Sequence, residues 1–279
     1  MVHSINSKYS ITFDDVLLSP SYSDIKPKDT STAIQIASLN LKLPIISSAM
    51  DTVTESKMAK EMALQGALGV IHRNMNISMQ VKEIQKVKKF RVSKLQANKS
   101  ALDLFGRLLV GAAVGVENNA YDRMLALIQS DVDAIFVDVA HAHTKTSLNF
   151  LKKTKQKLGK IPLIVGNIAT KEAAEALIKA GVNAVKVGIG PGSICTTRVV
   201  TGVGVPQLSA IIDVFKVANK YKIPVIADGG IKTSADIAKA IAGGATACMI
   251  GSLLAGTDES PGKLLKIKGN TYKSYRGMG

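Results

Sequence analysis

The sequence has few cysteines, few aromatic residues and no long apolar run. Its 279 residues include two cysteines, six phenylalanines, six tyrosines and no tryptophan. Two cysteines cannot build a disulfide framework, and a lone loop cysteine is typical of a reducing compartment, so we expect a cytoplasmic protein. No apolar run approaches the ~20 residues that cross a bilayer, and the first residues lack the basic and apolar segments of a secretory signal. These absences exclude a secreted disulfide scaffold and predict no membrane partner.

Positive charge is abundant but dispersed. Lysine and arginine together number 36 against 21 acidic residues, which gives a formal net charge of +15. The lysines are spread over many segments, with the densest cluster between Lys82 and Lys99. Few aromatic side chains are available to stack on bases, and no RNA-binding signature accompanies the charge. We therefore expect a solvated surface with some attraction for anionic substrates, and no nucleic-acid partner.

One supersecondary unit recurs along the chain: a helical segment, a turn of small residues and an apolar strand. Variants of this unit and further apolar runs predict eight strands, at residues 43–48, 65–72, 109–113, 130–138, 161–165, 180–188, 223–227 and 243–251. Short β-branched runs that alternate with helical segments are typical of parallel βαβ units. Eight such units predict a fold of the α/β class, a parallel (β/α)8 TIM barrel, and the chain length suits one such domain. A doubly wound open sheet is the alternative.

Two segments depart from this alternation. From Lys82 to Leu104 the chain is polar and basic, and we predict a connector there, with a short linker near residues 90–106. Towards the other end, a small hairpin is predicted around Gly269 and Asn270. No segment long enough for an ordinary helix follows the eighth predicted strand. We therefore expect residues 1–279 to form a single barrel domain without the last barrel helix.

The segment that points most clearly to chemistry is a glycine-rich turn with a cysteine at its tip. Gly188, Gly190 and Gly192 lead to Cys195 directly after an apolar run. Glycines permit positive φ and a close approach to a ligand, and successive amides in such a turn suit an anion. Neighbouring hydroxyls and Arg198 would favour the thiolate, which is the nucleophilic form of cysteine. A structural cysteine in a tight turn is the alternative interpretation.

Polar residues also follow other predicted strands, at the edge where parallel barrels carry their active sites. They include Ser48, Asp138, Asn167 and Asp228. Residues 228–230 and 251–252 place backbone amides at expected helix starts, an arrangement that barrels use to hold a phosphate after their last two strands. Glycines that only serve tight turns would leave the nearby Ser193 unexplained. We therefore predict a phosphate site at this end of the barrel.

Seven short motifs stand out from the rest of the sequence. They occupy residues 12–18, 47–56, 190–198, 202–207, 227–231, 251–256 and 275–279. Together they resemble the catalytic barrel of the inosine-5′-monophosphate dehydrogenase family, over nearly the whole chain. Guanosine monophosphate reductase shares the barrel and the cysteine loop, but the motif that begins Ser47-Ser-Ala-Met50 and the pair Val199-Val200 resemble the dehydrogenase.

This resemblance implies an NAD-dependent oxidation of inosine monophosphate to xanthosine monophosphate, a step of guanine nucleotide biosynthesis. Cys195 would attack C2 of the purine, a hydride would pass to NAD, and water would release the product, with Thr197 beside Cys195 helping to handle that water. The reductase reaction, from guanosine monophosphate with NADPH, is one alternative. A purine-nucleotide-binding barrel without catalysis is the other.

The resemblance also implies a set of binding residues. Those expected around the substrate are Ser48, Met50, Asn167, Ser193, Ile194, Asp228, Gly230, Gly251, Ser252, Tyr275, Gly277, Met278 and Gly279. Those expected at the cofactor are Asp138, Val139, Ala140 and Gly188. The backbone carbonyls of Gly190, Gly192 and Cys195 would bind a potassium ion, because carbonyl oxygens suit hard cations. A homotetramer is implied as well.

The chain departs from the family pattern in three ways. Members usually carry two regulatory cystathionine-synthase-type modules where this chain has only its linker, so nucleotide regulation through them is not expected. Val139 and Ala142 stand where the family has a hydroxyl residue and a glycine, and loss of one hydroxyl contact, about 1 kcal/mol, would weaken NAD binding. The flap that activates water would follow Gly279, outside the given sequence. Hydride transfer is therefore better supported than hydrolysis.

Overall fold

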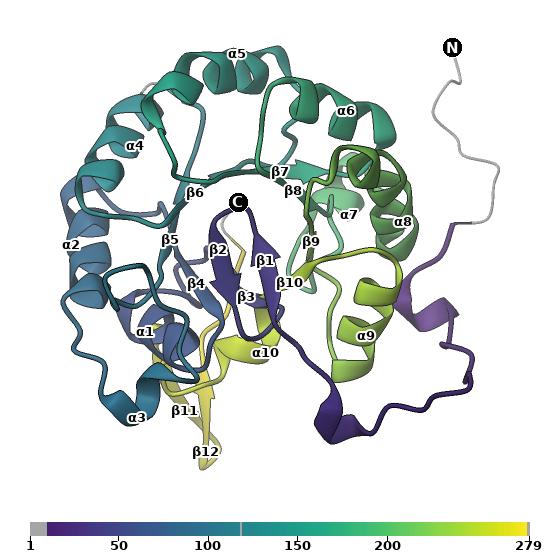
Figure 1. Ribbon diagram of the computed structural model, residues 1–279, viewed down its shortest axis with the longest axis horizontal. Coiled ribbons are helices and arrows are strands. Elements are labelled where there is room, and N and C mark those ends of the chain that lie inside the picture. Colours follow the sequence, from purple (N-terminus) through teal and green to yellow (C-terminus); the bar gives the residue numbers. More distant parts are fainter. Residues whose placement is uncertain (1–9, 118, 278–279) are drawn as a thin grey trace.

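The computed structural model describes residues 10–117 and 119–277. Eight parallel strands close into a barrel, in the order β10-β3-β4-β5-β6-β7-β8-β9 (Figure 1). They are β3 (Ile45–Ser47), β4 (Leu68–Ile71), β5 (Gly111–Val114), β6 (Ala134–Asp138), β7 (Leu163–Ile168), β8 (Ala184–Val187), β9 (Val225–Asp228) and β10 (Ala247–Ile250). Each lies within or overlaps one of the eight predicted strands. The structure therefore confirms the TIM barrel, and the open sheet is excluded.

Helices cover the outside of the barrel after each of its first seven strands. They are α1 (Ser56–Leu64), α2 (Ile77–Lys88), α4 (Ala120–Gln129), α5 (Lys145–Thr154), α6 (Lys171–Lys179), α8 (Gln207–Ala218) and α9 (Ser234–Ala242), with the shorter α3 (Lys94–Ala97) and α7 (Thr197–Thr201) in loops. Thr144, Thr170 and Thr233 begin α5, α6 and α9, because their hydroxyls accept a hydrogen bond from the third amide of the helix. These caps set where the loops at the strand ends give way to helix. No helix in the described residues is both long and apolar enough to span a membrane.

The chain after β10 has no helix of ordinary length within the described residues. Only α10 (Ser252–Ala255) follows that strand. An antiparallel hairpin of β11 (Leu264–Ile267) and β12 (Asn270–Lys273) comes next, at the predicted place. Lys268 and Gly269 form its turn with positive φ. The hairpin projects beside α10 in Figure 1, at the sector of the barrel that a last helix would cover.

The basic segment before β5 is more ordered than the sequence suggested. Our connector from Lys82 is wrong over its first part, because α2 continues to Lys88 with Ile84 and Val87 fully buried in the core. The Nζ atom of Lys88 lies 2.7 Å from Asp133 Oδ2 and 3.0 Å from Asp103 Oδ2. These ion pairs attach the linker to the barrel.

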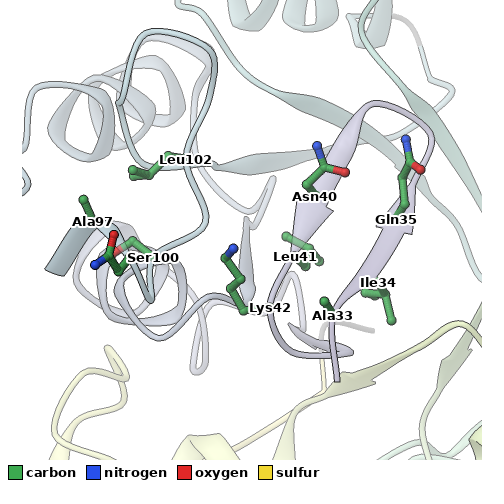
Figure 2. A pocket seen from close by; sticks show the side chains of 10 residues that line it. Ala33, Ile34, Gln35, Asn40, Leu41, Lys42, Ala97, Ser100 and Leu102 are labelled. Atoms are coloured by element: carbon green, nitrogen blue, oxygen red, sulfur yellow. The ribbon is translucent and has the colours of Figure 1, made fainter. Parts of the chain in front are cut away.

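Two apolar layers stabilise the fold, one between strands and helices and one inside the barrel. A hairpin that we did not predict, β1 (Ile34–Ile36) and β2 (Leu39–Leu41), lies across the amino-terminal mouth of the barrel (Figure 1). It buries Ile36, Leu39 and Leu41 in the inner layer. A cavity of about 590 Å³ lies between this hairpin and residues 97–102 (Figure 2). It is at the end of the barrel opposite the predicted site.

Candidate functional site

The two cysteines of the chain have opposite environments. Cys195 is exposed on the loop between β8 and α7, and its Sγ lies 3.2 Å from Thr197 Oγ1. The Cys195 amide donates to the Gly192 carbonyl at 3.1 Å, which shapes the turn. Cys248 lies on β10 in the core, where burial raises the pKa of its thiol to about 12. Of the two cysteine side chains, only that of Cys195 is exposed.

The Arg198 side chain stabilises the cysteine loop by hydrogen bonds to two backbone carbonyls on either side of it. Its Nε donates to the Ile189 carbonyl at 3.1 Å and its Nη2 to the Val205 carbonyl at 2.6 Å. Burial lowers the pKa of Arg198, and the nearby Cys195 opposes part of this shift. An arginine side chain remains charged in proteins, so a positive charge lies close to the thiol. Gly190 has a φ of +71°, and a Cβ there would lie 2.6 Å from Arg198 Cγ. Only glycine fits, because both the conformation and the contact exclude a side chain.

The turn after β9 packs directly on the cysteine loop. Gly229 has a φ of +93°, and a Cβ there would lie 2.8 Å from Pro191 Cγ. Gly230 follows with a φ of +78° and also faces Pro191. The predicted nucleophile loop and the predicted phosphate turn therefore form one surface, in which Gly229 meets Pro191 and Gly192.

Three other predicted site residues have side chains that lie close to Gly251. A Cβ added at Gly251 would lie 2.9 Å from Tyr275 Oη, and 3.4 Å from both Met50 Sδ and Ser48 Oγ. Ser48 and Met50 lie on the loop after β3, Gly251 on the loop after β10 and Tyr275 on the segment after β12. The absence of a side chain at Gly251 lets them converge at the start of α10.

The segment after β12 lies over the cysteine loop. Tyr275 lies close enough to Ser193 for the hydroxyl to influence its pKa, and a Cβ on Gly277 would lie 3.5 Å from the Ile194 carbonyl oxygen. Burial raises the pKa of Tyr275, the Ser193 hydroxyl lowers it and Asp228 raises it. The phenol is therefore protonated near neutral pH and can donate a hydrogen bond. The predicted Met278 and Gly279 lie outside the described residues.

A buried lysine that our sequence analysis missed connects the predicted substrate and cofactor residues. Lys186 on β8 is 1% exposed, and its Nζ lies 2.5 Å from Asp228 Oδ2 and 3.4 Å from Asp138 Oδ1. It also donates to Asn167 Oδ1. Burial by itself would lower the pKa of Lys186, but Asp138 and Asp228 outweigh it and raise that pKa. The available signal was a lysine inside the apolar run Ala184-Val-Lys-Val187, where an unpaired charge would be costly.

This network orients Asp228 towards a ligand. Asn167 Nδ2 donates to Asp228 Oδ2 at 2.9 Å and to the Gly188 carbonyl at 2.6 Å. With Lys186 and Asn167 on Oδ2, the other oxygen of Asp228 has no donor within the described part of the chain. A carboxylate held in this way can accept hydrogen bonds from a diol.

The predicted cofactor residues differ in what they can offer. The side chain of Asp138 is 31% exposed. The Val139 amide donates to the Gly166 carbonyl at 3.0 Å and its carbonyl accepts from the Asn167 amide at 2.8 Å, so its backbone is engaged. Ala140 is exposed on the loop that follows. Among these residues, only Asp138 presents a charged group towards the Lys186 network.

Comparison with known proteins places this arrangement in a family. The model of the IMP dehydrogenase / GMP reductase domain matches residues 10–279. The chain belongs to the IMP dehydrogenase / GMP reductase family. Its similarity to three relatives, each called inosine-5′-monophosphate dehydrogenase, covers most of both chains. The relative from Cryptosporidium parvum is 47% identical over 96% of this chain and 74% of its own, that from Borreliella burgdorferi 44% over 98% and 76%, and that from Methanocaldococcus jannaschii 42% over 99% and 77%.

These relatives differ from one another in what they carry inside the barrel sequence. The alignment with the Methanocaldococcus jannaschii family member spans 386 positions, well beyond the 279 residues of this chain. That with the Cryptosporidium parvum family member spans 298 positions. The first relative therefore holds a long internal segment without a counterpart here, whereas the second nearly matches the compact barrel. Both kinds of chain occur within the family, and this chain is of the compact kind.

Proposed function

We propose that this chain is a single catalytic barrel domain that oxidises inosine monophosphate to xanthosine monophosphate, with NAD as the hydride acceptor. The observation that carries this proposal is the packing of the exposed Cys195 loop on residues 228–230 at the carboxyl end of the barrel. The relatives named inosine-5′-monophosphate dehydrogenase add support, since they match along almost the entire chain. A nucleophile, a diol acceptor and phosphate donors on one surface suit a nucleotide that reacts at its base.

The nucleotide would be held by groups from four loops. Amides of Gly230 and Gly251, the hydroxyls of Ser193 and Ser252 and the phenol of Tyr275 are donors suited to a phosphate. The free oxygen of Asp228 would accept the ribose hydroxyls. The remaining residues proposed around the base and ribose are Ser48, Met50, Asn167, Ile194, Gly277, Met278 and Gly279.

Cys195 would carry the covalent chemistry. Its thiolate forms a bond to C2 of the hypoxanthine ring, and C2 then loses a hydride, which restores the conjugated ring as a thioimidate. Water next adds to C2, and one of its protons stays on N3 of the purine. The sulfur leaves with the other proton as a thiol, and this thiol then releases its proton to solvent, which restores the thiolate of Cys195. Thr197, whose hydroxyl is 3.2 Å from the sulfur, would hold that water beside C2. The net change is the exchange of a C2 hydrogen for an oxygen.

The site suits the cofactor and cation that the family implies. NAD supplies the hydride acceptor, and Asp138 offers a partly exposed carboxylate that can take hydrogen bonds from its ribose. Val139, Ala140 and Gly188 would line this side, with Val139 contributing apolar contact alone. A potassium ion would be held by the carbonyls of Gly190, Gly192 and Cys195. The Gly192 carbonyl accepts the Cys195 amide, and its second lone pair can still face a cation.

We also propose that the chain works as a homotetramer in the cytoplasm. Within the described residues, the chain after β10 forms α10 and the β11–β12 hairpin. Leu264, Leu265 and Ile267 of that hairpin are exposed. An associated copy would bury such apolar side chains.

A rapid-mixing experiment with inosine monophosphate, NAD and potassium tests the proposal. Reduced-cofactor absorbance is followed while protein-bound nucleotide is trapped. Continuous turnover is expected if hydrolysis proceeds in this chain. A single burst with a stable adduct on Cys195 would assign hydride transfer without hydrolysis. Nucleotide binding without any absorbance change would contradict the dehydrogenase and leave a binding barrel, and consumption of NADPH with guanosine monophosphate would assign the reductase reaction.

A further inference from the structure

At their carboxyl ends, β8 and β9 are joined by side-chain hydrogen bonds and not by backbone pairing. Backbone pairing of these strands ends at Val187 and Ala227. Beyond that point β8 turns into the cysteine loop at Gly188, with a φ of +150°, and β9 turns at Gly229, with a φ of +93°. The two turns remain very close, since a Cβ on Gly188 would lie 2.0 Å from the Asp228 carbonyl oxygen. The side chain of Asn167 joins Gly188 to the carboxylate of Asp228, and a second side chain joins the backbone carbonyls of the two strand ends.

Gln207 makes that contact. It is the first residue of α8 and is 2% exposed. Its Nε2 donates to the Val187 carbonyl at 2.9 Å and to the Asp228 carbonyl at 3.1 Å. Its Oε1 is buried and has no hydrogen-bond partner within the described residues. The reversed amide would place an oxygen against two carbonyl oxygens, so the carbonyls select this orientation. One amide group therefore connects the last paired residue of β8 with the residue that would bind the ribose.

Gln80 makes the same kind of contact elsewhere in the barrel, because its side-chain amide also donates to the backbone carbonyls of two neighbouring strands. It is fully buried on α2, and its Nε2 donates to the Ala113 carbonyl of β5 at 2.8 Å and to the Ile71 carbonyl of β4 at 3.4 Å. Its Oε1 accepts from Arg123 Nη1 at 2.7 Å. The β4–β5 pair lies across the barrel from β8 and β9. Gln80 therefore has the same chemistry and burial as Gln207, and it lies away from Cys195.

We propose that Gln207 is a positioning residue for the reaction, which sets the distance between the cysteine loop and Asp228 by holding the carbonyls of Val187 and Asp228. The inference rests on the proposed function. Gln207 acts through backbone groups of residues that flank the site, and the amide itself touches neither substrate nor cofactor. Without it the contacts of Asn167 and Lys186 still join the two turns through the Asp228 side chain, but the direct connection between the Val187 and Asp228 carbonyls is lost. The spacing of the two turns then loosens, and a nucleotide held by Asp228 presents C2 to Cys195 at a longer distance.

Two methionine variants separate positioning from stability. Methionine keeps the length of glutamine and removes its hydrogen bonds. We expect Gln207→Met to lower kcat/KM for inosine monophosphate by about tenfold or more, and Gln80→Met to leave it within about twofold. The melting temperature should show the reverse order, because Gln80→Met leaves Nη1 of the buried Arg123 without its acceptor, whereas Gln207→Met also removes an unpaired oxygen. A loss of kcat/KM that follows the melting temperature in both variants would overturn the inference.

A charge variant adds a pH readout. In Gln207→Glu the ionised carboxylate faces two carbonyl oxygens, whereas its neutral form donates to one of them. The kcat/KM of this variant, taken relative to the unaltered chain, is expected to rise about tenfold between about pH 8 and pH 6. A ratio that stays flat with pH would mean that Gln207 only stabilises the fold.

The unaltered chain is measured first, so that the two proposals fail separately. Absence of turnover there contradicts the proposed function alone. In that case the dissociation constant for inosine monophosphate is measured by calorimetry in the same variants. Weaker binding in Gln207→Met than in Gln80→Met supports the positioning role, and equal affinities overturn it.

Discussion

At the scale of single residues, Cys195 and Cys248 provide a direct test of the chemistry. Cys195→Ser is expected to remove detectable turnover, because a serine hydroxyl is a far weaker nucleophile at neutral pH. The dissociation constant for inosine monophosphate should stay within about threefold, since the phosphate and ribose contacts remain. Rapid mixing and calorimetry measure the two effects. Cys248→Ala is the control and should retain turnover, because that thiol lies in the core with its pKa raised to about 12.

Lys186 is the second residue whose environment predicts a large effect. Lys186→Met leaves the carboxylates of Asp138 and Asp228 close together without their shared counter-ion. Removal of one partner from a buried charge network is expected to lower the free energy of unfolding by about 3–5 kcal/mol. Urea denaturation measures this loss. The double variant with Asp138→Asn should recover part of it, and equal stabilities of the single and double variants would show that Asp138 is not coupled to Lys186.

At the scale of elements, the linker before β5 depends on Asp103. Its Oδ1 accepts from the amides of Phe105 and Arg107, both at 2.9 Å, and its Oδ2 contacts Arg107 Nε at 2.8 Å and Lys88 Nζ at 3.0 Å. Burial opposes ionisation, but the Arg107 amide and the Lys88 and Arg107 side chains lower the pKa of Asp103 to about 2. One carboxylate therefore connects the linker to α2.

This lowered pKa makes the linker sensitive to acid. Because the folded pKa lies below the ordinary value of 3.8, the contribution of Asp103 to stability is present above about pH 4 and is lost as the pH falls towards 2. Asp103→Asn should cost about 1–3 kcal/mol at neutral pH and reduce the slope of stability against pH in this acid range. Urea midpoints between pH 7 and the acid limit measure both. An unchanged acid slope would assign the loss to other carboxylates.

At the scale of the whole molecule, the β1–β2 hairpin closes the inner core although it forms no part of the barrel sheet. Leu41 is 1% exposed and packs with residues inside the barrel. Leu41→Ala should therefore cost about 2–5 kcal/mol, because it leaves a cavity in a packed layer. Leu95→Ala on α3, where the side chain is 93% exposed, is the control and should change stability by less than about 0.5 kcal/mol. Comparable losses in both variants would contradict this assignment of the core.

The fold and much of the candidate site could be predicted because their signals are local. Apolar runs followed by helical segments predicted all eight barrel strands, and glycines at 188, 190 and 192 predicted the turn that presents Cys195. The β1–β2 hairpin was missed because its strands are three residues long and gain their stability from the barrel interior. The end of α2 was missed because a basic surface conceals its buried Ile84 and Val87.

The sequence by itself determined the barrel, the nucleophile loop and the family, because strand periodicity, turn glycines and contiguous motifs are properties of neighbouring residues. Only the tertiary structure decided which side chains join the strand ends around the site. Lys186 meets Asp138 across 48 residues of chain and Asp228 across 42. Gln207 likewise joins strand ends that the sequence separates. Such contacts depend on which strands become neighbours when the barrel closes, and no local pattern specifies that a lysine or glutamine will reach those partners.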